Sequence, residues 1–419
     1  MGTTHSLRKG AAAALLPLLL TALSACQSGG TGDAKASPSP SGTPVFDGRL
    51  DGQLAAATRA TTAAGSSAFT WTLSYGSAKG TAVDRTTGTQ DYAKDTAQAE
   101  RVLDIPRRFP EDAATDLGGR PGGKPVAEAY EIKGNHVDYR TRQGGWLRYS
   151  SQASMDVVDH FGPVLARAGD AAPFGGTLAE VVRNSYAKKQ PVKGADGSRT
   201  YALSIPSQTA NDALPTSLAA SSTYGNSSES IALTVVLDGQ GRLLRASADY
   251  TPLLKPLHQD GVLKGVTSLK ADYVLTGLGS TTVPAPAAGK SGRLEDAEKA
   301  LTPLHALRPG ACGSADTGLA GSLDLVRAVP CGSDADLRVF GQVKIKESIE
   351  GNPTGVADKK AGERCGSRFD SAPAAWVRDA RPAGTYYTYG AGSSSSSYTG
   401  PDVDIEGDFT CYVVTSGRV

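Results

Sequence analysis

The side chains whose types and spacing point most directly to chemistry are thiols. The chain has five cysteines, and four of them lie in its last quarter. Thiols pair as disulfides outside the cytoplasm, and an even number within one region is typical of a disulfide framework. We therefore expect two disulfides. Sequence alone leaves three pairings open, and the neighbour-with-neighbour pairing, Cys312 with Cys331 and Cys365 with Cys411, is favoured.

A zinc site is the alternative for the same four thiols. Structural zinc sites place two cysteines a few residues apart, or add histidines at a fixed short spacing. The chain has no Cys-x-x-Cys sequence, and no histidine lies at a suitable spacing near these cysteines. We therefore expect no metal and no cofactor here.

The fifth cysteine, Cys26, stands at the end of a secretory signal. A basic pair, Arg8-Lys9, precedes an apolar run, Ala11 to Leu23, which is too short to span a bilayer. The Leu-Ser-Ala-Cys sequence that ends at Cys26 resembles the lipobox of bacterial lipoproteins. The resemblance implies that residues 1–25 are cleaved and that lipid on the Cys26 sulfur anchors the chain to the outer face of the cell membrane. The alternative is an ordinary signal peptide followed by a chance cysteine.

The segment after this cysteine is a spacer by composition. Residues 26–45 are mostly Ser, Gly, Thr, Pro and Ala, so they cannot bury enough apolar surface to order themselves, and we expect a flexible tether. Signal cleavage removes two of the 43 Lys and Arg residues and none of the 42 Asp and Glu residues, which leaves a net charge of −1. Such a balance gives no electrostatic case for nucleic-acid binding.

Three fragments mimic the motifs of penicillin-binding serine enzymes: Ser185-x-x-Lys188, Tyr224-x-Asn226 and Lys290-Ser-Gly. That mechanism needs the serine at the start of a helix, with its hydroxyl facing a cleft. Here Ser185 is predicted near a helix end, and Lys290 lies in a segment rich in Pro, Ala and Gly. A serine enzyme is therefore only a remote alternative, and we expect no catalytic residue.

Two further patterns could suggest a metal. The run from Asp402 to Gly407 mimics the start of an EF-hand loop, but the position of the bidentate glutamate holds Val413, and the alternation of Val403 and Ile405 favours a strand. The histidines are scattered without metal-ligand spacing, so we expect them to be ordinary hydrogen-bonded residues. They are His5, His136, His160, His258 and His305.

The elements that would position a site are mostly strands. Strict period-two alternation over 231–237, 244–250 and 269–275 predicts an antiparallel sheet with one covered and one exposed face. Further strands are expected at 68–75, 126–132, 136–140 and 200–205, with a hairpin turn at Gly134-Asn135.

Helices are expected at 54–64 and 155–165, with a third after a capping box at Thr177. The third should end before Pro191. Its core-facing residues should be Leu178, Val181, Val182 and Tyr186.

Residues 46–283 resemble actinobacterial lipoproteins of the LolA/LppX type. The residues that carry the resemblance are Gly65–Phe69, Gly88–Tyr92, Trp146 and the hairpin Asp238-x-x-Gly241-x-Leu243. The resemblance implies a curved antiparallel half-barrel with helices on its concave face. It also implies a site for lipid acyl chains between sheet and helices, although the lining residues cannot be named.

Residues 309–419 resemble the septum-formation domain of actinobacterial envelope proteins. A histidine that this family places after its second cysteine is replaced here by Asp334-Ala335-Asp336. The resemblance therefore implies only a smaller, disulfide-stapled, β-rich fold. We expect the stretch from Tyr386 to Tyr398 to be a surface loop or an aromatic contact surface. The segments that carry the resemblance are Pro309–Cys312, Val329–Cys331, Asp336–Gly341, Cys365 and Cys411.

These patterns predict an α+β chain with residues 284–308 as a linker, within which 294–301 forms a short helix. We expect an extracytoplasmic, membrane-anchored, non-enzymatic protein that binds a lipid, lipoglycan or other amphipathic ligand in the half-barrel. An envelope protein is a possible further partner. The alternative is a cell-envelope scaffold or sensor that acts through protein contacts and has no ligand cavity.

Overall fold

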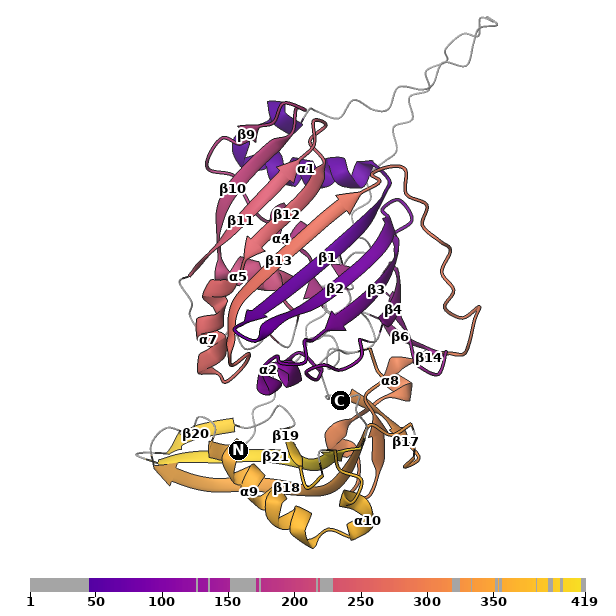
Figure 1. Cartoon of the computed structure of the whole chain (residues 1–419), viewed down its shortest axis with the longest axis vertical. Helices are drawn as coiled ribbons and strands as arrows, with labels where there is room; N and C mark the ends of the chain where they lie inside the picture. Colours follow the sequence, from indigo (N-terminus) through magenta and orange to yellow (C-terminus); the bar gives the residue numbers. More distant parts are fainter. Residues whose placement is uncertain are drawn as a thin grey trace, which may run out of the picture. The chain divides into compact units, whose positions relative to one another are not determined.

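Alternating apolar and polar residues build the dominant element of the structure, a twelve-stranded, mostly antiparallel sheet (Figure 1). The computed structural model describes residues 45–415 except 126, 135, 151–170, 173–174, 216–217, 219–228, 319–324, 333, 351–352, 354–355, 382, 391–394 and 400–401. Cys26, most of the tether, and the predicted helix at 155–165 therefore lie outside the described residues.

The large sheet has the strand order β14-β6-β5-β4-β3-β2-β1-β13-β12-β11-β10-β9 and is not closed into a barrel. All described strand pairs in it are antiparallel except β14 with β6. Its strands are β1 (Ser66–Ser77), β2 (Gly80–Asp91), β3 (Thr96–Asp104), β4 (Ala127–Lys133), β5 (His136–Arg140), β6 (Trp146–Ser150), β9 (Val192–Lys193), β10 (Arg199–Pro206), β11 (Ser230–Leu237), β12 (Leu243–Asp249), β13 (Val266–Thr276) and β14 (Leu294–Asp296).

Short helices pack on one face of this sheet, which we call the inner face. Helix α1 (Gln53–Ala63) and helix α4 (Leu178–Arg183) contact each other and β12, and α4 also contacts β13. Thr61 on α1 accepts a hydrogen bond of 2.8 Å from the backbone N–H of Leu243, which fixes the helix to the start of β12. The other short helices of this part are α2 (Glu111–Asp116), α5 (Ser207–Ala210) and α7 (Leu254–Gln259).

A second sheet of seven strands lies in the C-terminal part and carries helix α9 (Val356–Ser371). Its centre is the long antiparallel pair of β18 and β21. The strands are β15 (Thr302–Pro303), β16 (Cys312–Ser314), β17 (Leu325–Val329), β18 (Leu337–Glu350), β19 (Tyr387–Gly390), β20 (Ser395–Thr399) and β21 (Asp402–Val414); helices α8 (Ala297–Ala300) and α10 (Ala374–Val377) and the two-stranded sheet of β7 (Ala171–Ala172) and β8 (Gly175–Gly176) complete the main elements.

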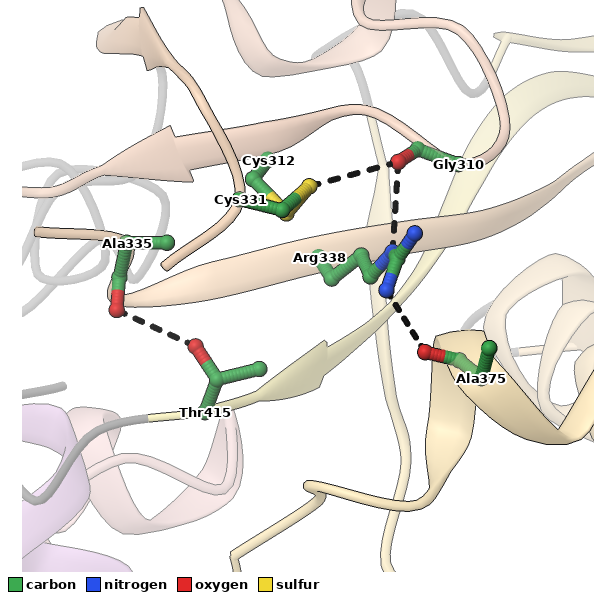
Figure 2. The surroundings of a disulfide bond; sticks show 7 residues. All are labelled: Gly310, Cys312, Cys331, Ala335, Arg338, Ala375 and Thr415. Carbon is green, nitrogen blue, oxygen red and sulfur yellow. Dashed lines mark hydrogen bonds between the residues drawn. A yellow bond between two sulfur atoms is a disulfide. The ribbon is translucent and has the colours of Figure 1, made fainter. Parts of the chain in front are cut away.

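Two disulfides join elements of this second part in the neighbour-with-neighbour pairing. Cys312 on β16 is bonded to Cys331, and Cys365 on α9 is bonded to Cys411 on β21. Figure 2 shows the first, with Arg338 beside it donating hydrogen bonds to the carbonyls of Gly310 and Ala375. Cys365 and Cys411 are fully buried in the core beneath α9, so this disulfide pins the helix to the sheet.

All seven sequence-predicted strands are confirmed, with ends shifted by no more than three residues. The helix after Thr177 is shorter than predicted, because it ends at Arg183. As a result Leu178, Val181 and Val182 are buried as expected, but Tyr186 lies beyond the helix and is 59% exposed, so its predicted place in the core is wrong.

Two stretches predicted without regular structure contain strands. The segment 386–398 includes β19 and β20, both paired with β21, because a long strand offers its backbone groups to both. Within 284–308, the predicted helix at 294–301 is instead strand β14 followed by the single-turn helix α8. The Asp402–Glu406 run lies in β21, as its alternation indicated.

Candidate ligand-binding face of the large sheet

The inner face gathers an apolar and aromatic surface at the centre of the sheet. On β1 every second residue is buried, and the register pairs Leu73 with Ala271 and Trp71 with Tyr273 of β13. Figure 1 shows these two strands side by side in the middle of the sheet. The main inner-face side chains here are Phe69, Trp71, Leu73, Tyr75, Leu269, Ala271, Tyr273 and Leu275.

A row of charged side chains continues this surface across β2, β3 and β4. Arg101 is only 7% exposed and donates two hydrogen bonds of 2.8 Å to the carboxylate of Asp84. It donates another hydrogen bond, also of 2.8 Å, to Glu128. Burial disfavours its charge, but Asp84 and Glu128 outweigh burial and raise the pKa of Arg101 above its ordinary value. The guanidinium therefore stays ionised inside the sheet.

Tyr75 ends this row on β1 and is fully buried. Among the described residues its hydroxyl has no hydrogen-bond partner. Burial, and then the negative charge of Asp84, raise the pKa of Tyr75 above its ordinary value. The phenol is thus held in its neutral, proton-donating form next to a mutually neutralised ion pair.

Three tyrosines on neighbouring strands mark the other side of the inner face. Tyr130, Tyr139 and Tyr149 lie on β4, β5 and β6, and the register pairs Tyr130 with Tyr139. Each hydroxyl donates a hydrogen bond to a loop of the C-terminal part: Tyr130 to the Gly318 carbonyl at 3.2 Å, Tyr139 to Asp316 at 2.7 Å, and Tyr149 to the Thr317 carbonyl. We call residues 314–318 the docked loop.

Glycine is required where this loop approaches the tyrosines most closely. Gly318 has φ +80°, and a Cβ at this position would clash with the ring of Tyr139. Burial raises the pKa values of Tyr130 and Tyr139, and nearby carboxylates raise them further. The hydroxyls therefore remain hydrogen-bond donors to the loop across the ordinary pH range.

Arg142, just after β5, forms ion pairs with two carboxylates that hold the docked loop in place. Its guanidinium lies 3.2 Å from Asp316 and 2.8 Å from Asp336, whose side chain is fully buried. Asp336 also accepts hydrogen bonds from the Ser314 hydroxyl and the Ala315 backbone N–H. The buried Asp336 carboxylate thus fixes the docked loop.

The first of the fragments that mimic a serine enzyme lies directly after helix α4. Ser185 follows the end of α4, and its hydroxyl donates to the Val181 carbonyl of the same helix. Lys188 packs over the ring of Tyr186, 5.5 Å from its centroid. Tyr224 and Asn226 lie outside the described residues.

The remaining candidate ligands stay apart. Within the described part of the chain, no three His, Cys, Asp or Glu residues form a group that could hold a metal ion. The buried Nδ1 of His136 has no hydrogen-bond partner there, so the expectation that this histidine is satisfied is not met. No described helix is both long and apolar enough to cross a membrane.

Sequence reasoning missed every polar residue of the inner face. Arg101 and Asp84 lie at inward positions of β3 and β2, and the composition of these strands does not indicate that they contribute to a core. One signal was available: Val137 and Tyr139 alternate on β5, and Tyr130 and Ile132 on β4, so an inward tyrosine on each strand could be read from the period.

No protein-family model matches this chain, and no curated protein matches it significantly. Solved structures that are similar to it include the following two. One is the Mycobacterium tuberculosis lipoprotein LppX, with 12% identity over 55% of this chain and 98% of that chain, at a TM-score of 0.26. The other is the Pseudomonas aeruginosa MucA/MucB complex, with 9% identity over 85% of this chain and 93% of that chain, at a TM-score of 0.26. The two family resemblances stated from sequence remain predictions.

Proposed function

We propose that this chain is an extracytoplasmic lipoprotein, anchored to the cell membrane through Cys26, whose inner face binds the apolar part of an amphipathic ligand. The protein performs no chemistry on the ligand. The large sheet serves as the curved half-barrel that the sequence predicts, and the short helices serve as its cover.

The observation that carries the proposal is the composition of the inner face. The β1–β13 centre offers aromatic and aliphatic side chains, and a polar row of Tyr75, Asp84, Arg101 and Glu128 runs beside it on the same face. A core that served packing alone gains little from buried ionised groups, because their desolvation cost offsets their attraction. A ligand with apolar chains and a polar group matches both parts, and burying its chains contributes about 25 cal/mol per Å².

Native mass spectrometry of the full-length protein, made in a host that exports and acylates lipoproteins, tests the proposal. We expect a mass above that of the acylated chain under native conditions, and loss of the excess on denaturation, since the ligand is not covalently bound. Identical native and denatured masses in repeated preparations would falsify ligand binding.

The anchor is tested separately with the Cys26→Ser variant. We expect this variant to leave the membrane fraction and still carry the ligand, because the two lipids occupy different sites. A variant that stays in the membrane fraction contradicts anchoring at this residue.

The docked loop favours a second candidate function, a cell-envelope scaffold or sensor. Three tyrosine hydroxyls and Arg142 connect the large sheet to the second sheet through hydrogen bonds and an ion pair. A conformational change in one sheet would therefore be transmitted to the other. In this reading the inner face is filled by its own side chains and a protein partner is the ligand. Crosslinking in the native host, with no lipid found by mass spectrometry, supports the scaffold over the carrier.

A further inference from the structure

The Tyr75 hydroxyl is a buried polar group that forms no hydrogen bond within the described part of the fold. Tyrosine hydroxyls normally find a partner when buried, because an unpaired one costs about 1–3 kcal/mol. The comparison with Tyr250 is direct: that residue, directly after β12, is also fully buried, and its hydroxyl donates a 2.8 Å hydrogen bond to the Ala210 carbonyl. Tyr75 has no such partner among the described residues.

The surroundings of Tyr75 define what could pair with it. Because the phenol keeps its proton, it offers a donor and needs an acceptor. Its nearest charged neighbours on the inner face are Asp84 and Arg101, which neutralise each other through two 2.8 Å hydrogen bonds. An anion brought here would meet Asp84 and a cation would meet Arg101, and either would lose its hydration. A neutral acceptor is the group that avoids both costs.

We propose that the Tyr75 hydroxyl donates a hydrogen bond to a carbonyl oxygen of the bound ligand, so that the ligand belongs to the acyl esters or amides. This inference rests on the proposed function and narrows it from any amphiphile to an acylated one. The acyl chain lies along the apolar centre formed by β1 and β13, and its carbonyl lies where that centre meets the polar row.

Comparing the binding of an ester lipid with that of its ether analogue isolates the contribution of the carbonyl groups. The full chain carrying Cys26→Ser is freed of bound lipid and titrated with vesicles of dipalmitoyl phosphatidylcholine or of its dihexadecyl ether analogue, which lacks both carbonyls. We expect the protein to bind the ester about three- to tenfold more tightly, the value of one hydrogen bond. In the Tyr75→Phe variant this preference disappears.

Stability without lipid provides the second measurement. We expect Tyr75→Phe to leave the unfolding midpoint unchanged or to raise it, since it removes an unpaired buried hydroxyl. The matched variant Tyr250→Phe lowers the midpoint, because it strands the Ala210 carbonyl, and keeps the ester preference.

The outcomes are distinct. Equal binding of ester and ether by the unaltered protein overturns the carbonyl contact and leaves ligand binding intact. A Tyr75→Phe variant destabilised as much as Tyr250→Phe shows that the hydroxyl is already paired, for example by water, and also overturns it. Failure to bind either lipid overturns the inference together with the proposed function.

Discussion

The hydroxyl of Tyr139 donates a 2.7 Å hydrogen bond to Asp316, a residue 177 positions further along the chain. The backbone N–H of Arg142 donates to the other oxygen of the same carboxylate at 2.8 Å. The Asp316 carboxylate thus accepts one hydrogen bond from strand β5 and one from the turn that follows it. These bonds hold the docked loop against the large sheet.

Arg142→Met should destabilise the protein by about 2–3 kcal/mol. The substitution removes the Arg142 ion partner of the buried Asp336 carboxylate, which also accepts hydrogen bonds from Ser314 and Ala315. Denaturant unfolding followed by circular dichroism measures the loss. Arg140→Met, at an exposed position of β5, is the control and should change stability by less than about 0.5 kcal/mol. Equal effects of the two variants would refute the role of this ion pair.

Thr61→Ala should cost about 1–3 kcal/mol of stability. The buried hydroxyl accepts the hydrogen bond of the Leu243 N–H, and its removal takes away the acceptor of this buried donor. Thr61→Ser restores the acceptor and should recover most of the loss. Thr62→Ala, one position along on the exposed side of α1, serves as the comparison and should be close to neutral. A loss in Thr61→Ser as large as in Thr61→Ala contradicts the role given to the hydroxyl.

Removal of the Cys365–Cys411 disulfide should cost more than removal of Cys312–Cys331. The closed loops span 46 and 19 residues, so the chain-entropy relation gives about 4 and about 3 kcal/mol. Paired cysteine-to-alanine variants, compared by thermal unfolding, test the order. The reverse order would mean that loop length does not govern these two cross-links.

Asp212→Asn should stabilise the protein at pH 7 and have no effect near pH 3. Burial disfavours the charged carboxylate and raises the pKa of Asp212 above its ordinary value of 3.8. In the window above that value the folded state binds the proton more tightly than the unfolded state, so the stability of the unaltered protein falls as pH rises through it. Unfolding curves at pH 3, 5 and 7 report the difference. A difference in stability between the two proteins that stays constant with pH argues against titration of Asp212.

The strands with strict alternation were the predictable part of the fold. β11 buries every second residue, β12 does so from Ala246 and β13 from Leu269, because each has one covered face, so the period identifies them without tertiary knowledge. The capping box at Thr177 likewise identified the start of α4, where the threonine hydroxyl accepts from the Ala179 N–H.

Strand β3 and the polar row were out of reach for a physical reason. Thr96–Asp104 contains Ala, Gln, Glu and Arg, residues that favour helices, and it is a strand because β2 and β4 pair with both of its edges. Arg101 occupies an inward position that the period assigns to an apolar residue. The carboxylates of Asp84 and Glu128, contributed by the two flanking strands, stabilise its charge there.

The segment 287–296 is fastened to the outside of the large sheet at several points. The Glu131 carboxylate accepts from the backbone N–H groups of Ala287 and Ala288, the Trp146 indole donates to the Ser291 carbonyl at 2.7 Å, and β14 extends the sheet beside β6. The consequence concerns the covalent continuity of the chain. A protease nick at the turn around Ser280 leaves the downstream fragment with these attachments and the docked loop, so the two fragments should co-elute as one particle until a denaturant separates them.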